Sequence, residues 1–212
     1  MTEPPLLLGS VEIVCGPMFV GKSSELRRRA NCATWAGNSV LVISNPLDEL
    51  RAGAGHVLTH DGHKLPCQHV ADLDTLRFEP TQNYHTILID ECQFFDVHQL
   101  VRFVKHAVQH CTALVLFGLD GQYNLQPWKW VGKLLPYAFR ITKLAGQCKA
   151  CPHRAPSTCS VRIEEPNWPS TVGESEEAVV VVGGDDKYKG SCLDCHPCLP
   201  RESGITRSPF DL

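Results

Sequence analysis

The sequence predicts an α/β protein in which a parallel-sheet domain precedes a smaller, cysteine-bearing lobe. Two observations indicate the sheet domain. Over the first 145 residues, short β-rich runs alternate with helical runs, as in βαβ units, and residues 16–23 fit the pattern GxxxxGKS between an apolar run and a helical run. The lobe follows from a change of composition after residue 147, where CxxC pairs appear and helical patterns become rare. We expect domains at 1–147 and 148–196, and a disordered tail at 197–212.

The elements of the first domain follow from hydrophobic periodicity. Short apolar runs predict strands at residues 11–15, 40–44, 86–90, 113–119 and 140–144. Helical spacing predicts helices at 24–35, 95–110 and 130–137. Residues 45–70 are rich in turn-forming residues and look loop-rich or hairpin-like. In the lobe we expect a strand at 178–182, preceded by an acidic, proline-bearing mobile loop at 163–177.

The GxxxxGKS segment predicts a P-loop that binds a nucleoside triphosphate. Backbone N–H groups in such a loop cradle phosphate oxygens at a helix N-terminus, Lys22 reaches the outer phosphates, and the Ser23 hydroxyl ligates Mg²⁺. A glycine-rich turn without function is the alternative, and the flanking strand and helix patterns favour the P-loop. The candidate residues for ATP and Mg²⁺ are Gly16, Pro17, Met18, Phe19, Val20, Gly21, Lys22 and Ser23.

A second chemical signal is the run Thr86-Ile-Leu-Ile-Asp-Glu-Cys-Gln-Phe-Phe95, a strand that ends in two carboxylates. At the end of a central strand beside a P-loop, Asp90 is placed to hold Mg²⁺ or its water shell. Strand alternation points Glu91 elsewhere, toward a hydroxyl or a water that it deprotonates as general base. This pair leaves the acceptor open, because a nucleic-acid-stimulated ATPase has the same residues.

Eleven cysteines in a chain without a secretory signal are expected to be reduced, and their spacing separates metal ligands from buried thiols. The pairs Cys148/Cys151 and Cys192/Cys195 are two CxxC knuckles, and four thiolates suit a tetrahedral structural Zn²⁺ site. A redox-active CxxC is the less favoured reading. The neighbouring residues that stay open as replacement ligands are His153, His196 and Cys198.

Composition excludes several classes of protein. The 212 residues are 43% hydrophobic and 20% charged, with a formal charge of −3. This acidic balance lacks the basic surplus of a nucleic-acid binder, and the triplet Arg27-Arg28-Arg29 is expected to be a solvated helix face. The N-terminus lacks a signal-peptide pattern, and nowhere do 18 apolar residues follow one another. We expect a cytoplasmic protein with neither nucleic-acid nor membrane partners.

Several motifs together resemble one family. They are Gly16-Pro-Met-Phe-Val-Gly-Lys-Ser-Ser-Glu-Leu26, Thr59-His-Asp61, Ile89-Asp-Glu-Cys-Gln-Phe-Phe95, Leu119-Asp-Gly-Gln-Tyr123, the two CxxC pairs and Gly183-Gly-Asp-Asp-Lys-Tyr188. Over residues 9–195 the chain resembles the type II thymidine kinases, the cytosolic, zinc-bearing class. The resemblance implies a RecA-like P-loop domain and a zinc lobe carrying a lasso loop. It also implies transfer of the ATP γ-phosphate to the 5′-hydroxyl of thymidine, giving dTMP for DNA precursor salvage.

The resemblance also assigns roles to residues. Lys22, Ser23 and Asp90 match the triphosphate and magnesium positions, and Glu91 matches the general base. Arg51, with Asp48, resembles an Asp-x-Arg pair near the phosphates, although two residues separate them here instead of one. The side chains that match the thymidine pocket are Met18, Leu119, Tyr123, Trp128, Thr158 and Tyr188. The lasso positions, which read the base through their backbone, are Val179, Val180, Val181, Val182 and Gly183.

The family further implies a homotetramer and feedback inhibition by dTTP. This chain departs from the family at Cys92, where Gly or Ala is usual, and in a longer 163–177 loop. Two other classes stay open: a P-loop ATPase acting on nucleic acid, and a zinc-ribbon interaction module with a degenerate kinase domain. The intact P-loop and Asp-Glu pair argue against degeneracy, and the net acidity argues against a DNA groove.

Overall fold

The computed structural model describes residues 8–48, 53–59, 62–76, 84–110, 112–151, 155–163, 184 and 186–199. The chain forms two compact units. The first comprises Met1–Cys15, Gly21–Asp120 and Trp128–Lys143, and the second comprises Gly16–Val20, Gly121–Pro127 and Leu144–Leu212. The domain limits expected from the sequence stay a prediction.

The first unit is built on a six-stranded sheet in the order β5-β2-β6-β7-β1-β8, and every neighbouring pair is parallel. This confirms the predicted α/β class. The strands are β1 (Val11–Cys15), β2 (Val40–Ser44), β5 (Gln68–His69), β6 (Thr86–Ile89), β7 (Ala113–Gly118) and β8 (Arg140–Lys143). All five predicted strands are present, three of them one residue shorter at the end. Every residue of β1 and β7 is buried, which explains their unbroken apolar runs.

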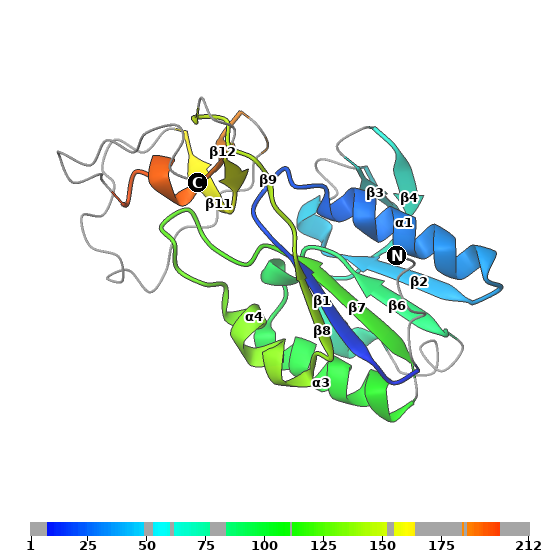
Figure 1. Ribbon diagram of the computed structural model, residues 1–212. Coiled ribbons are helices and arrows are strands. Elements are labelled where there is room, and N and C mark those ends of the chain that lie inside the picture. The colour runs from blue at the N-terminus through cyan, green and yellow to red at the C-terminus, as the bar shows by residue number, and fades with distance from the viewer. Residues whose placement is uncertain are drawn as a thin grey trace, which may run out of the picture. The chain divides into compact units, whose positions relative to one another are not determined.

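Helices cover both faces of this sheet (Figure 1): α1 (Lys22–Trp35) lies on one face, and α3 (Val97–Gln109) and α4 (Lys129–Leu134) lie on the other. Helix α1 begins two residues earlier than predicted, because Gly21 supplies the left-handed N-cap. The Asp96 carboxylate caps α3 by accepting hydrogen bonds from the N–H groups of His98 and Gln99. No helix in the described part of the chain is long and apolar enough to cross a membrane.

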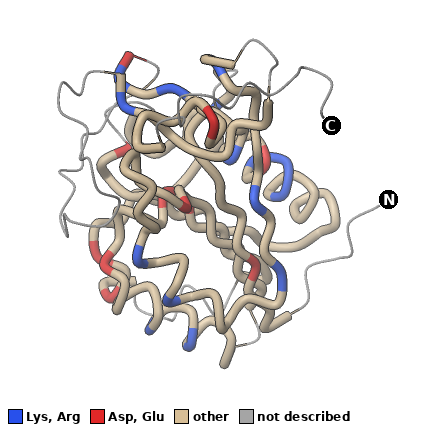
Figure 2. The backbone as a smooth tube through the Cα atoms, turned by 60° about the vertical axis from the view of Figure 1, so that its left-hand side comes forward, with Lys and Arg blue, Asp and Glu red and all other residues tan. Residues whose placement is uncertain are grey.

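The sequence predicts that the basic triplet Arg27-Arg28-Arg29 of α1 is a solvated helix face, and this prediction is wrong for Arg29. Arg29 is only 5% exposed, because its guanidinium lies 2.6 Å from the Glu12 carboxylate of β1 and 2.7 Å from Glu25. Arg28 does face solvent and pairs with Glu25. Acidic and basic positions are both spread over many elements of the described backbone (Figure 2), in keeping with 20 Lys and Arg against 23 Asp and Glu.

The segment at 45–70, predicted as loop-rich or hairpin-like, contains the antiparallel hairpin of β3 (His56–Leu58) and β4 (Lys64–Pro66), after the short 3₁₀ helix η1 (Pro46–Asp48). A second 3₁₀ helix, η2 (Leu73–Thr75), follows β5. Beyond α4, the predicted helix continues as the 3₁₀ turn η5 (Leu135–Tyr137).

The described part of the second unit contains two small antiparallel ladders. Strand β9 (Gly146–Gln147) pairs with β10 (Pro156–Ser157), and β11 (Cys159–Arg162) pairs with β12 (Tyr188–Ser191) ahead of η6 (Leu193–Cys195). Residues 164–183 and 200–212 lie outside the described residues. The predicted strand at 178–182, most of the 163–177 loop and most of the tail are therefore not described.

Candidate active site

The carboxyl ends of the parallel strands gather several charged residues at one edge of the first unit. Strands β1 and β7 end in register, with Cys15 beside Gly118. Asp90 directly follows β6, and Asp120 lies two residues beyond β7. Ligands of open α/β sheets bind outside this edge. The structure therefore makes this edge the candidate active site.

The loop that links β1 to α1 has the backbone of a tight phosphate-binding turn. Gly16, Phe19 and Gly21 all have positive φ, at 147°, 64° and 84°. A side chain at Gly16 would place its Cβ 2.5 Å from the Leu144 carbonyl oxygen, so only glycine fits there. Phe19 holds a left-handed conformation that costs a non-glycine residue on the order of 1 kcal/mol, a kind of strain that is concentrated at functional sites.

Lys22 is a buried cation at this edge, and Lys143 is a second, half-exposed one that pairs with Asp120 at 2.6 Å. Burial of the Lys22 side chain lowers the pKa of its ammonium, while the carboxylates of Glu91, Asp90 and Asp120 act in the opposite direction. The structure thus brings together Lys22, Asp90 and Glu91, as the sequence predicts, and adds Asp120. The Lys22 ammonium is suited to the negatively charged oxygens of a triphosphate. The carboxylates around it are suited to the divalent cation that accompanies a triphosphate.

Asp90 has the environment of a cation ligand. It is 1% exposed, its Oδ1 accepts a hydrogen bond from the Glu91 N–H at 3.0 Å, and its buried Oδ2 has no hydrogen-bond partner within the described residues. Burial, with Glu91 and Asp48, raises the pKa of the Asp90 carboxyl to about 8. Buried carboxylates so close together are stabilised by a hard divalent cation, and oxygen ligands suit Mg²⁺. The residues present therefore fit Mg²⁺.

Glu91 sits in a strained turn immediately after Asp90. Its backbone is left-handed, with φ 52° and ψ 44°, at the start of the 3₁₀ helix η4 (Cys92–Phe94). The Glu91 carboxylate accepts a hydrogen bond from the side-chain amide of Gln93. Gln93 and Asp120 both lie in motifs of the family resemblance, but no role is predicted from the sequence for either residue. The available signal for Asp120 is its place after an apolar strand, whereas Gln93 depends on contacts that no local pattern encodes.

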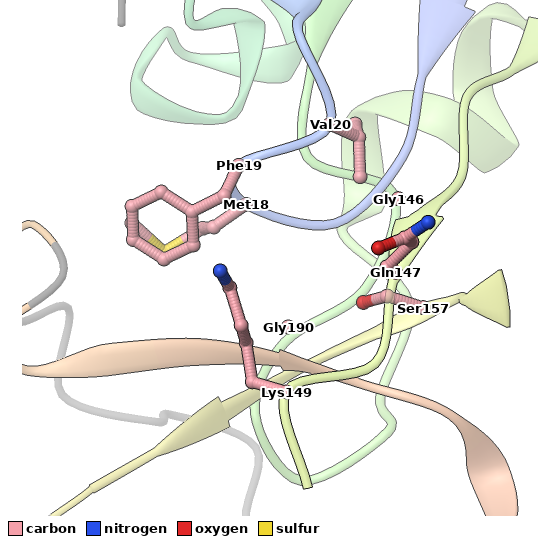
Figure 3. A pocket seen from close by; sticks show the side chains of 8 residues that line it. All are labelled: Met18, Phe19, Val20, Gly146, Gln147, Lys149, Ser157 and Gly190. Carbon is pink, nitrogen blue, oxygen red and sulfur yellow. The ribbon is translucent and has the colours of Figure 1, made fainter. Parts of the chain in front are cut away.

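The second unit contains a pocket of about 230 Å³ (Figure 3). Its lining residues are Met18, Phe19, Val20, Gly146, Gln147, Lys149, Ser157 and Gly190. The buried Ser157 Oγ has no hydrogen-bond partner in the described part of the chain. A Cβ at Gly190 would lie 2.5 Å from this oxygen, so glycine keeps the space open. Among the residues predicted to bind thymidine, Met18 lines this pocket.

The other predicted thymidine residues are spread over both units. In the second unit, the Tyr123 ring lies 5.8 Å from the Arg162 guanidinium, Tyr188 pairs with Arg162 in the ladder, and the Thr158 N–H donates to the Ser191 carbonyl. The first unit contains Leu119 and Trp128. Arg51 and the lasso positions 179–183 lie outside the described residues.

Three of the four predicted zinc ligands form a cluster. The Sγ atoms of Cys148, Cys192 and Cys195 all lie within 4.8 Å of one another. Tetrahedral zinc with bonds of about 2.3 Å places its sulfur ligands roughly 3.8 Å apart, so the cluster fits this metal. Burial opposes ionisation of Cys148, but hydrogen bonds from the backbone of Cys192, Ala150 and Cys151 and from the Cys192 side chain together lower the pKa of this thiol to about 7.

The fourth ligand is not fixed by the structure. Cys151 is described but lies outside the three-cysteine cluster, as do His196 and Cys198. The His196 ring is buried, and its Nδ1 accepts a hydrogen bond from the Cys198 N–H at 3.2 Å. His153 lies outside the described residues.

A parallel sheet with a lysine-bearing loop after its first strand and an Asp-Glu pair after a central strand is the arrangement of a P-loop nucleotide-binding protein. A model of the thymidine kinase family matches residues 9–196, and the chain therefore belongs to this family.

Curated relatives agree with the assignment. A thymidine kinase of Mesomycoplasma hyopneumoniae (strain 7448) is 30% identical over 194 residues, which are 89% of this chain and 95% of its own. A thymidine kinase of Choristoneura fumiferana entomopoxvirus is 29% identical over 189 residues, 88% of this chain and 96% of its own. Among solved structures, the replication initiator DnaA bound to AMPPCP and single-stranded DNA matches 69% of this chain and 42% of its own, with a TM-score of 0.42 and 12% identity. That similarity is too low to bear on fold or function.

Proposed function

We propose that this protein is a thymidine kinase that transfers the γ-phosphate of ATP to the 5′-hydroxyl of thymidine and yields dTMP for DNA precursor salvage. The observation that carries the proposal is the grouping of Lys22 with Asp90 and Glu91 at the carboxyl edge of the sheet, in a chain of the thymidine kinase family. Phosphoryl transfer needs chiefly positioning and charge stabilisation, and these three residues supply both.

Each residue has a distinct task. The Lys22 ammonium offsets negative charge on the transferring phosphoryl oxygens. Asp90 and Ser23 would hold Mg²⁺, which would neutralise part of the negative charge of the triphosphate. Glu91 takes the proton of the 5′-hydroxyl as that oxygen attacks. For phosphate contact we retain Arg51 as a further candidate.

Recognition of thymidine is proposed for the residues that match the family's pocket. Their aromatic and apolar character suits a planar base with a methyl group. The proposed set is Met18, Leu119, Tyr123, Trp128, Thr158 and Tyr188, with the backbone of Val179, Val180, Val181, Val182 and Gly183.

A nucleoside panel tests the proposal. Purified protein with ATP and Mg²⁺ is offered thymidine, deoxyuridine, deoxycytidine, deoxyadenosine or no nucleoside, and dTMP and ADP are quantified. We expect ADP to form in step with dTMP and only slowly without nucleoside, and Lys22→Ala to abolish both products. Rapid ADP formation without nucleoside that rises with single-stranded DNA would instead support the nucleic-acid-dependent ATPase.

We also propose that Cys148, Cys151, Cys192 and Cys195 bind one structural zinc ion, with the three-cysteine cluster as its core. Elemental analysis is expected to find about one zinc per chain, because a closed four-thiolate site holds a single ion. Cys195→Ser should lose most of this zinc, whereas His196→Ala and Cys198→Ala serve as matched controls and should retain it. Folded, active protein without zinc would disprove the site, and loss of zinc in a control variant would change its ligand set.

Family membership further supports a homotetramer, feedback inhibition by dTTP and a cytoplasmic location. The reduced thiols that a zinc site requires agree with that compartment. Sedimentation of the purified protein and inhibition of dTMP formation by dTTP are the corresponding measurements.

A further inference from the structure

The side-chain amide of Gln93 is held at both of its ends. Its Oε1 accepts a hydrogen bond from the Leu119 N–H at 2.9 Å, and its Nε2 donates to Oε2 of Glu91. Chemistry fixes this orientation, because a flipped amide would set N–H against N–H at Leu119 and oxygen against oxygen at Glu91. Gln93 is 8% exposed, so water has little access to replace either contact.

The surroundings of Gln93 are equally fixed. Trp130, 2% exposed, donates from Nε1 to the Leu119 carbonyl at 2.9 Å and so ties α4 to the end of β7. At Gly118 an added Cβ would lie 2.7 Å from Gln93 Oε1 and 2.8 Å from the Trp130 ring. The Gln93 amide is thus packed against the end of β7 at Gly118 and close to the buried indole of Trp130.

The Glu91 side chain is less firmly held by its surroundings than the Gln93 side chain. Its backbone is in the left-handed conformation, and its side chain is only partly buried. With Oε2 held by Gln93, Oε1 is the oxygen left to receive a proton. A general base must lie within hydrogen-bond reach of the hydroxyl that it deprotonates, and a misplacement of 1 Å is enough to slow a reaction about a hundredfold.

We propose that Gln93 is a positioning residue that holds the Glu91 carboxylate in its reactive orientation. The inference rests on the proposed function, in which Glu91 is the general base. Gln93 does not touch the substrate in this role. Its effect on kcat is transmitted through Glu91, and this distinguishes it from a residue that only supports the fold.

The first test replaces Gln93 with Met, which keeps the length of the side chain and removes both hydrogen bonds. We expect kcat for dTMP formation to fall about 10- to 100-fold, with KM for thymidine and for ATP changed less than about threefold. Gln109→Met, the same substitution at an exposed position of α3, is the matched control and should leave kcat unchanged. A Gln93→Met enzyme with wild-type kcat would overturn the proposal.

The decisive test is a double-mutant cycle with Glu91→Gln. If Gln93 acts only through the base, adding Gln93→Met to Glu91→Gln should lower kcat less than about twofold further. An equal loss in both backgrounds would show a structural role and overturn the proposal. Melting curves check folding, and Gln93→Asn, too short to reach both partners, takes the place of Met if the Met variant does not fold. Absence of dTMP formation by wild-type protein would instead reject the proposed function.

Discussion

Glu91→Gln is expected to slow dTMP formation by about two to four powers of ten while ATP binding and the fold stay near normal. The amide keeps the shape of the side chain and its oxygen still accepts a hydrogen bond from Gln93, but it cannot take a proton. The loss should appear in kcat because the hydroxyl proton moves only as the phosphoryl group is transferred. Rapid-quench measurement of dTMP in a single turnover isolates this step.

Two controls separate a kinase from an ATPase that activates water. A 5′-deoxy analogue of thymidine should bind, as measured by calorimetry, yet accept no phosphate, because it lacks the hydroxyl that Glu91 deprotonates. Single-stranded DNA should not stimulate ATP consumption by the wild-type protein. If Glu91→Gln formed dTMP at the wild-type rate, Glu91 would not be the base.

Asp90→Asn is expected to have opposite effects on activity and on stability. The change removes a ligand charge from the magnesium position, so dTMP formation should fall by two or more powers of ten. Without Mg²⁺, the same change should raise the free energy of unfolding, because a buried carboxylate beside Glu91 and Asp48 becomes a neutral amide.

The stability gain should depend on pH in a defined direction. In the folded protein the pKa of Asp90 is raised from 3.8 to about 8, so its stabilising contribution as a neutral acid is complete below pH 3.8 and is lost as pH rises toward 8. Asn cannot ionise, and the advantage of the variant should therefore grow between pH 4 and pH 8. Melting temperatures in Mg²⁺-free buffer without chelator, which leaves bound zinc in place, measure it, with Asp96→Asn as control, since Asn caps a helix as well as Asp does. An advantage that shrank with rising pH would contradict the assignment.

Local patterns in the sequence were sufficient for five of the six strands of the sheet, all but β5, and they indicated the proposed reacting groups. The strands are runs of consecutive apolar residues, and Lys22, Asp90 and Glu91 stand at fixed distances from the strands that position them. Pairings between distant residues were not predictable in this way. Arg29 can be buried because it pairs with Glu12, which lies 17 positions away in the sequence. Gln93 is held by a hydrogen bond from the backbone N–H of Leu119, which lies 26 positions away. Neither distance corresponds to a helical or strand period.

The cysteine cluster lies between these cases. The two CxxC pairs predict four metal-binding cysteines, and three of them, Cys148, Cys192 and Cys195, form the cluster. The spacing does not distinguish Cys151 from these three, whereas in the structure the Cys151 sulfur lies outside the cluster. Burial also separates the four, since Cys148 and Cys192 are buried and Cys151 and Cys195 are half-buried.

Gly118 shows how the packing of a strand end restricts the variation that this sequence tolerates. Any other residue would bring a Cβ to 2.7 Å from the Gln93 amide oxygen and 3.2 Å from the Cys92 nitrogen, and β7 is locked in register on both sides. Substitution of Gly118, even by alanine, is therefore expected to displace the Gln93 amide or the Trp130 ring. Selection for turnover is expected to keep position 118 as constant as the reacting residues themselves.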